Sequence, residues 1–220
     1  MLVNGQTTGV EEKLDAAEAA LAQRAPGTAA DDTTRNLLGQ IASTWAVLAL
    51  TRYDVETMLT QSRRALLYLS PSNLALRATA NWTLGCGYQH LVDRGEARRA
   101  FAESIALSQA CGDSFTTIMA TIGLADMQIA ENQLSAAAES FQRVLQLLGD
   151  PPLPVACEAH RVLAHINYEW NDLAAAERHG RQSLHLSRQY GPGIDRFVIC
   201  EVFLAQLNTE QQPIGRRKGQ

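Results

Sequence analysis

A short unit, a large apolar residue followed by a small one, recurs along the chain inside segments of helical character. Successive copies are separated by 39, 40, 39 and 41 residues. A fixed period in this range is the signature of a repeat architecture, in which each unit packs only against its neighbours. We therefore expect a solenoid without a single central core. The copies are Trp45-Ala46, Leu84-Gly85, Leu124-Ala125, Leu163-Ala164 and, more loosely, Leu204-Ala205.

Composition favours helices over strands. Hydrophobic residues make up 46% of the chain, as in ordinary folded proteins, but aromatic residues only 6%. Alanine is abundant, which suits closely packed helices, whereas the β-branched and aromatic residues that favour strands are thinly spread. The chain is therefore expected to be all-α, with about ten helices in antiparallel pairs.

The expected helices lie between Pro- and Gly-rich breaks. Breaks such as Ser70-Pro71-Ser72 separate one pair from the next, while turns within pairs, as at Arg94-Gly95, are only two or three residues long. Turns this short make the paired helices antiparallel neighbours. The expected helices are Val10–Ala25, Thr34–Arg52, Asp54–Leu69, Asn73–Leu91, Glu96–Ala110, Ser114–Glu131, Leu134–Leu148, Val155–Trp170, Leu173–Tyr190 and Ile194–Leu207.

The chain ends and the charge limit the possible partners. We expect a repeat domain at residues 10–207, a disordered or tag-like N-terminus at residues 1–9 and a flexible polar tail at residues 208–220.

The net charge is −4 and no clustered basic stripe is present, so direct nucleic-acid binding is not expected. No leader or apolar run of membrane-spanning length occurs, and the four widely spaced cysteines lack a CxxC motif. These features indicate a cytoplasmic protein.

Residues at fixed offsets from the large-small pair indicate the type of repeat. Leu84-Gly85, Ala97 and Phe101 match the tetratricopeptide repeat (TPR), whose first helix carries a Leu-Gly pair and whose second carries small and aromatic positions. Ser62 and Gly180 replace the aromatic residue in the first and fourth units. A HEAT-type array has a similar period, but these positions favour a TPR-like array with longer helices.

Two longer stretches resemble one particular family. Residues 95–104 and 168–179 are similar to the superhelical sensor domain of MalT-like, LuxR-type ATP-dependent transcriptional activators, and the resemblance extends from about Gly5 to Leu207. It implies a right-handed superhelical solenoid that binds an inducer or a regulatory protein in its concave groove. In that family an ATPase module precedes the repeats and a DNA-binding module follows them.

The chain departs from the full family pattern at both ends. It contains no GxxxxGK[ST] phosphate loop, and no helix-turn-helix unit follows Leu207. We therefore expect either an excised fragment of a longer parent chain or a homodimer that covers the end faces of the solenoid.

Candidate groove residues follow from the TPR resemblance, which places the first helix of each pair on the concave surface. These positions supply an aromatic ring, an acid, a cation and hydrogen-bonding groups, which suit a ligand with a flat or sugar-like face and polar edges. Each of these residues also has a purely structural interpretation. Trp82 can fill space between helices, Asp126 and Arg161 can form an ion pair between repeats, and the other side chains can serve packing alone. The candidate ligand-binding residues are Trp82, Gln89, Asp126, Arg161, His165 and Tyr168.

Catalysis has little support in the sequence. Cys86 and His90 resemble a thiol–base dyad at helical spacing, but nothing nearby marks an orienting group or an oxyanion donor. Cys157 and His160 alone do not make a zinc site. We expect no catalytic residue, no metal and no cofactor.

Two functions remain in competition. The first is a sensor module of a MalT-like transcriptional regulator, which binds a small-molecule effector or a regulatory protein and signals through a conformational shift. The second is a TPR scaffold that binds a peptide or protein partner and has no small-molecule role.

Overall fold

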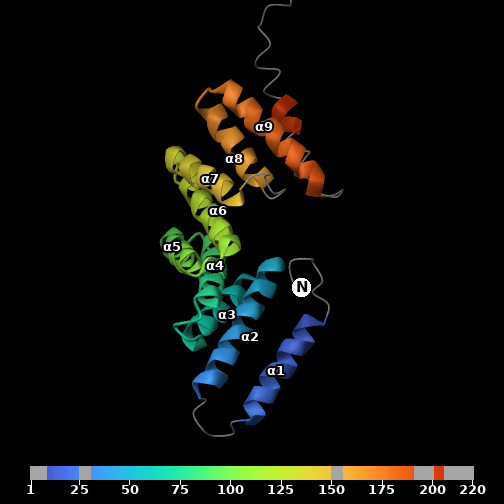
Figure 1. Ribbon diagram of the computed structural model, residues 1–220, viewed down its shortest axis with the longest axis vertical. Helices are drawn as coiled ribbons and strands as arrows, with labels where there is room; N and C mark the ends of the chain where they lie inside the picture. Colours follow the sequence, from blue (N-terminus) through green and yellow to red (C-terminus); the bar gives the residue numbers. More distant parts are fainter. Residues whose placement is uncertain (1–8, 25–30, 150–155, 191–200, 206–220) are drawn as a thin grey trace, which may run out of the picture. The chain divides into compact units, whose positions relative to one another are not determined.

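The computed structural model describes residues 9–24, 31–149, 156–190 and 201–205 (Figure 1). Within these ranges every regular element is a helix, which confirms the all-α prediction. Most of the predicted N-terminal segment 1–9 and the whole of the predicted tail 208–220 lie outside the described residues. The helices are α1 (Val10–Arg24), α2 (Asp32–Thr51), α3 (Val55–Tyr68), α4 (Leu74–His90), α5 (Arg94–Cys111), α6 (Ser114–Ala130), α7 (Leu134–Leu148), α8 (Ala156–Glu169), α9 (Leu173–Ser187) and the short 3₁₀ helix η2 (Arg188–Tyr190).

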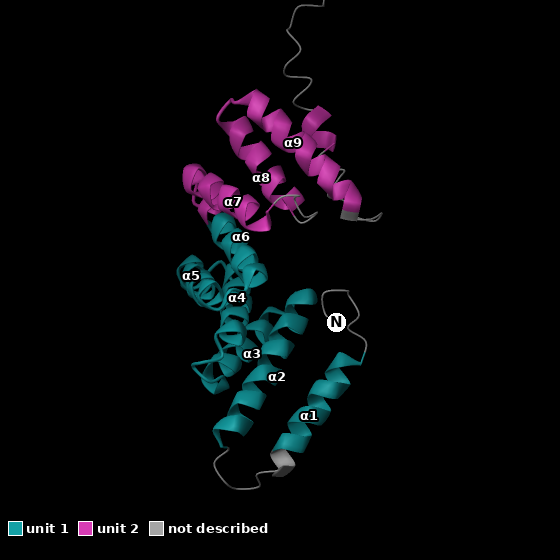
Figure 2. Ribbon diagram, viewed as in Figure 1, with its two compact units in different colours: residues 1–127 teal, residues 128–220 magenta. Residues whose placement is uncertain are grey.

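The chain divides into two compact units, residues 1–127 and residues 128–220 (Figure 2). In the first unit α2 packs against α3, α4 against α5, and α4 also contacts α2 and α3. In the second unit α8 packs against both α7 and α9. Each helix thus mainly contacts its neighbours in sequence, as a repeat architecture requires.

The four described turns between paired helices share one backbone conformation, and three of them share a side-chain cap. The carboxylates of Asp54, Asp93 and Asp172 each accept a hydrogen bond from the backbone N–H three residues later, at 3.1, 3.2 and 3.0 Å. This interaction satisfies an otherwise unpaired donor and sets the start of α3, α5 and α9. The residue before the capping position has left-handed backbone angles in all four turns, with φ between 57° and 61°; these residues are Tyr53, Val92, Asn132 and Asn171.

Phe101 of α5 occupies the core of the first unit. Its ring is fully buried and packs in one cluster with Trp82, Ala97 and Ala120, among others. A Cβ atom added at Gly85 would lie 2.7 Å from this ring. The second residue of the Leu84-Gly85 pair is therefore small because the aromatic ring of the partner helix fills that space.

The two units that lack the aromatic residue fill its place differently. At Ser62, which is fully buried, the hydroxyl lies 2.7 Å from that of Thr83, so a hydrogen-bonded pair replaces the ring. At Gly180 the space is taken from outside the pair, because an added Cβ would lie 2.9 Å from a methyl carbon of Leu204. The missing aromatic ring is thus compensated by a buried hydrogen bond at Ser62 and by packing at Gly180.

Candidate functional site

The predicted residues of the first unit lie on α4 and α6. Trp82 is only 9% exposed and belongs to the core cluster around Phe101. Its indole packs edge to face against Phe115 of α6, with the ring centroids 6.3 Å apart and an interplanar angle of 84°. The main role of Trp82 is therefore to join α4 to α6, and little of its ring remains for a ligand.

Gln89 and Asp126 are both half-buried. Asp126 lies close enough to Cys86 to influence its ionisation: burial first, and the negative charge of Asp126 second, raise the pKa of Cys86 to about 12. The thiol is therefore protonated at neutral pH, whereas a cysteine nucleophile must be a thiolate. His90, the partner in the dyad considered above, is exposed, and its ring packs against Tyr53 at 5.9 Å between centroids. These features disfavour a Cys86–His90 dyad.

The predicted residues of the second unit form one stripe on α8. Arg161, His165 and Tyr168 occupy positions i, i+4 and i+7, which share a helix face. The Nε atom of Arg161 donates a hydrogen bond to Oε2 of Glu158 at 3.0 Å, so its observed ion-pair partner lies one turn earlier on the same helix. This bond uses one of the five guanidinium donors.

Phe203 extends this stripe with a second aromatic surface. Its ring centroid lies 4.4 Å from that of His165 and 6.0 Å from that of Tyr168. Burial and the charge of Arg161 lower the pKa of His165, partly offset by Glu169, so the imidazole is neutral at pH 7. Sequence reasoning omitted Phe203, although the neighbouring Leu204-Ala205 pair already marked this helix as a fifth repeat copy.

A second histidine contact was also missed. Nδ1 of His160 on α8 lies 2.9 Å from Nδ1 of His179 on α9, so one imidazole donates a hydrogen bond to the other. Burial first, and the neighbouring His179 second, lower the pKa of His160 to about 4. The pKa of His179 is lowered by burial and by the charge of Arg178. No sequence signal predicts this contact, because His160 and His179 are 19 residues apart on different helices. Rules for side-chain contacts within one helix apply only to residues three or four apart.

Neither a metal cluster nor a membrane span emerges from the described helices. Among residues 9–24, 31–149, 156–190 and 201–205, no group of three or more His, Cys, Asp or Glu side chains is arranged to hold a metal ion. Over the same ranges, no helix is both long and apolar enough to cross a membrane.

The sequence comparison identifies the repeat type. A profile of the MalT-like TPR region matches residues 39–215, which is most of the chain. The chain belongs to this family. A search of curated protein sequences found no match. The MalT-like TPR assignment confirms the predicted family and the predicted type of helical module, which is typically non-catalytic.

Solved structures support the same fold for this MalT-like TPR chain. BtubC (BKLC) from P. vanneervenii has 14% sequence identity and a TM-score of 0.64, with 97% of each chain covered. A putative kinesin light chain from Podosopora anserina with nearly identical TPR-like repeats has 15% identity and a TM-score of 0.56, covering 80% of this chain and 87% of that one. MamA protein has 14% identity and a TM-score of 0.52, covering 78% and 87%. At these identities the likeness concerns the fold alone.

Proposed function

We propose that this chain is the effector-binding or partner-binding sensor module of a MalT-like transcriptional regulator. The observation that carries the proposal is the α8 stripe, where a cation, an imidazole and a phenol share one helix face beside the ring of Phe203. First helices line the inner surface in TPR arrays, and a face with aromatic rings and convergent polar groups suits a small polar ligand. In the first unit, taken by itself, Gln89 and Asp126 are proposed as polar ligand contacts on α4 and α6, where Trp82 belongs to the core cluster.

The mechanism is a shift in population between conformations of the repeat array. A ligand that contacts adjacent repeats more favourably in one conformation moves the equilibrium toward that conformation by its difference in affinity. In a parent chain, ATPase and DNA-binding modules would read that change in the cytoplasm. A homodimer is the alternative to a longer parent chain, because a second copy of the module could then cover the end faces of the repeat array.

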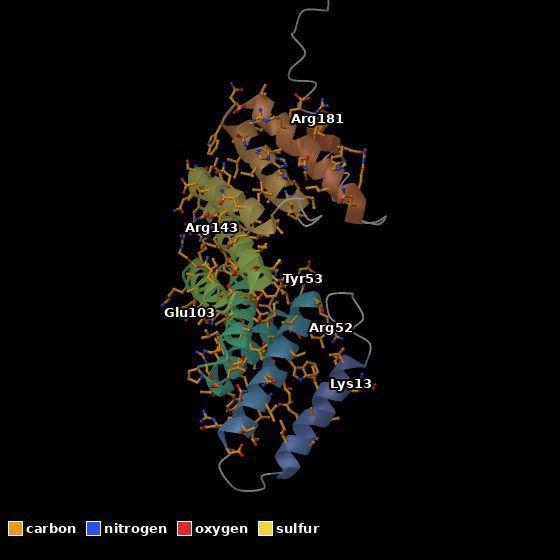
Figure 3. The ribbon with its side chains drawn as sticks, in the orientation of Figure 1. Lys13, Arg52, Tyr53, Glu103, Arg143 and Arg181 are labelled. Atoms are coloured by element: carbon orange, nitrogen blue, oxygen red, sulfur yellow. The ribbon has the colours of Figure 1, made fainter. Side chains whose placement is uncertain are left out.

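A thermal-shift screen against sugars, nucleotides, amino acids and short peptides tests the proposal. A ligand that binds the folded state raises Tm, and about 2.7 kcal/mol of stabilisation is expected at a hundredfold excess over Kd. Arg161→Gln and Tyr168→Phe should each reduce that rise. Arg181→Gln, on the exposed face of α9 (Figure 3), is the matched control and should not. A rise that all three variants retain would contradict a site on the α8 stripe.

The scaffold function remains the second candidate because of an apolar patch at the turns of the first unit. Tyr53, Leu91 and Val92 expose 75%, 58% and 69% of their surface, and Tyr53 lies just beyond the end of α2 (Figure 3). Exposed apolar clusters on a folded domain often mark a protein contact. If Tm rises only with peptides, and Tyr53→Ser abolishes the rise while Arg161→Gln does not, the scaffold function is favoured.

A further inference from the structure

A cavity of about 400 Å³ lies in the first unit at the end of α3. This volume falls within the range of small-molecule sites. None of the predicted groove residues lines the cavity, so the cavity is separate from the α8 stripe. Its walls come from the start of α2, the last turn of α3, the loop that follows and the first turn of α4; the lining residues are Asp32, Arg35, Leu66, Leu67, Tyr68, Leu69, Ser70, Pro71 and Arg77.

Two guanidinium groups converge on this cavity from different helices. Nη1 of Arg77 donates to the carbonyl oxygens of Leu66 and Leu69 at 3.1 and 3.4 Å. Nη2 of Arg35 lies 3.5 Å from the carbonyl oxygen of Leu67, at the limit of a hydrogen bond. Both arginines therefore gather at the last turn of α3. Because each guanidinium has five N–H donors, these bonds leave most of the donors available.

The charge of the two arginines is not neutralised by an ion pair. Within the part of the chain that the structure describes, neither guanidinium forms an ion pair with a carboxylate. The backbone carbonyl groups at the C-terminal end of α3 carry only a partial negative charge. Asp32 is the one acidic residue of the lining. The lining thus carries two positive charges and one carboxylate.

The same cavity has an apolar side. Leu67 is 66% exposed although it is a large aliphatic residue, and the ring of Tyr68 and Pro71 continue this surface. Guanidinium groups bind phosphate and carboxylate oxygens through paired donors, and the apolar wall suits a ring or short aliphatic body. The two features together select a ligand with a compact oxyanion at one end and an apolar group at the other.

We propose that the cavity between α2, α3 and α4 is a binding site for a small organic anion, a phosphate or carboxylate joined to an apolar body, held by Arg35 and Arg77. Asp32 opposes the anion and so lowers the affinity. The site gives the first unit a ligand of its own, independent of the α8 stripe in the second unit.

Isothermal titration with phenyl phosphate, benzoate and inorganic phosphate at constant ionic strength tests the site. Arg35→Gln should weaken phenyl phosphate binding about tenfold, because a charge-assisted hydrogen bond is lost. Asp32→Asn should strengthen it, since a like charge is removed. Tighter binding of phenyl phosphate than of benzoate indicates a phosphate ligand, and the reverse order a carboxylate ligand. Weaker binding of inorganic phosphate than of either aromatic anion confirms the apolar wall.

The controls separate binding from a purely structural role of the arginines. Arg77→Gln removes the hydrogen bonds to the carbonyl oxygens of Leu66 and Leu69 and can unfold the chain, so Arg35→Gln, with its single long contact, is the primary variant. Arg99→Gln removes an exposed positive charge from α5 in the same unit and should leave binding unchanged. The proposal is overturned if none of the three anions binds at millimolar concentration, or if Arg35→Gln and Arg99→Gln bind phenyl phosphate equally well.

Discussion

Val92 occupies a backbone conformation that Asn132 and Asn171 adopt at lower cost in later turns. All three residues have φ near +60°, where a β-branched side chain is strained and asparagine is tolerated. The Val92 side chain gains little burial in return, because 69% of it is exposed. The strain at this turn is therefore not offset by packing within the described residues.

Replacing Val92 by asparagine should stabilise the protein. We expect the free energy of unfolding to rise by about 1 kcal/mol, since the strain is removed and little buried surface is lost. Urea denaturation followed by circular dichroism measures the change. The reverse substitution at the equivalent turn, Asn132→Val, is the matched control and should lower the free energy of unfolding by a similar amount. An unchanged midpoint in both variants would contradict the strain argument.

The His160–His179 pair should make stability depend on pH. Both pKa values are lower in the folded state than the ordinary value near 6.5, so acid protonates the unfolded chain first. The free energy of unfolding should be highest above about pH 7 and fall as the pH drops from about 6.5 toward 4. Allowing for partial solvent exposure, the loss should be about 1–2 kcal/mol.

Denaturation midpoints between pH 4.5 and pH 7.5 measure this dependence. The double variant His160→Asn with His179→Asn should show a shallower decline, with a remainder from His165. An equal slope in the double variant and in the native protein would mean that the pair does not titrate as described.

At the level of helices, glycines of α4 and α6 let both helices approach the ring of Phe101. An added Cβ would lie 2.7 Å from the ring at Gly85 and 2.5 Å at Gly123, closer than real carbon contacts allow. The aromatic ring thus sets the distance between α5 and its two neighbours. This contact explains why the sequence alternates large and small residues at these positions.

Gly123→Ala should therefore destabilise the protein by about 1–3 kcal/mol through overpacking. Combining it with Phe101→Leu should cost less than the sum of the two single changes, because the smaller side chain relieves the clash. Gly95→Ala is the control: its added Cβ meets only an oxygen of Asp93 at 3.8 Å, and we expect no loss of stability. Additive effects of Gly123→Ala and Phe101→Leu would contradict the proposed contact.

Helix positions were largely predictable from sequence because their signals are local. The helix expected at Thr34–Arg52 is observed at Asp32–Thr51, and that expected at Leu134–Leu148 has the same bounds. The small shift in α2 comes from Asp31, whose carboxylate accepts a hydrogen bond from the N–H of Thr34 at 2.7 Å. Most of the helix expected at Ile194–Leu207 lies outside the described residues, and its described part, 201–205, is helical.

At the level of the whole chain, contacts between neighbouring helices predict local rather than global responses to mutation. In repeat proteins stability is close to a sum over units and their nearest-neighbour interfaces. Phe101→Leu should therefore speed amide exchange in α4, α5 and α6 and leave α8 and α9 unchanged. Hydrogen–deuterium exchange with mass spectrometry resolves these segments.

A reciprocal variant completes that experiment. Leu163 is 1% exposed on α8, so Leu163→Ala should speed exchange in α8 and α9 and spare α4 and α5. If either variant speeds exchange equally in both units, the chain unfolds as one cooperative body and the repeat description of its stability fails.

The sequence by itself determined the helices, their pairing and the repeat family. These features depend on the period, on turn chemistry and on residues at fixed offsets, all of which are local along the chain. The sequence placed Arg161, His165 and Tyr168 on one helix face, and their role as a binding site stays a prediction. It left open whether Trp82 fills space in the core, which its burial now decides, and it did not indicate the contact of Phe203.

Only the tertiary structure decided which side chains meet between helices. The Nδ1 atoms of His160 and His179, the guanidinium groups of Arg35 and Arg77, and the ring of Phe101 all find partners on other helices. Such contacts depend on the distance and rotation between helices to within a fraction of an ångström. That precision arises from side-chain packing, which periodicity along one chain does not specify.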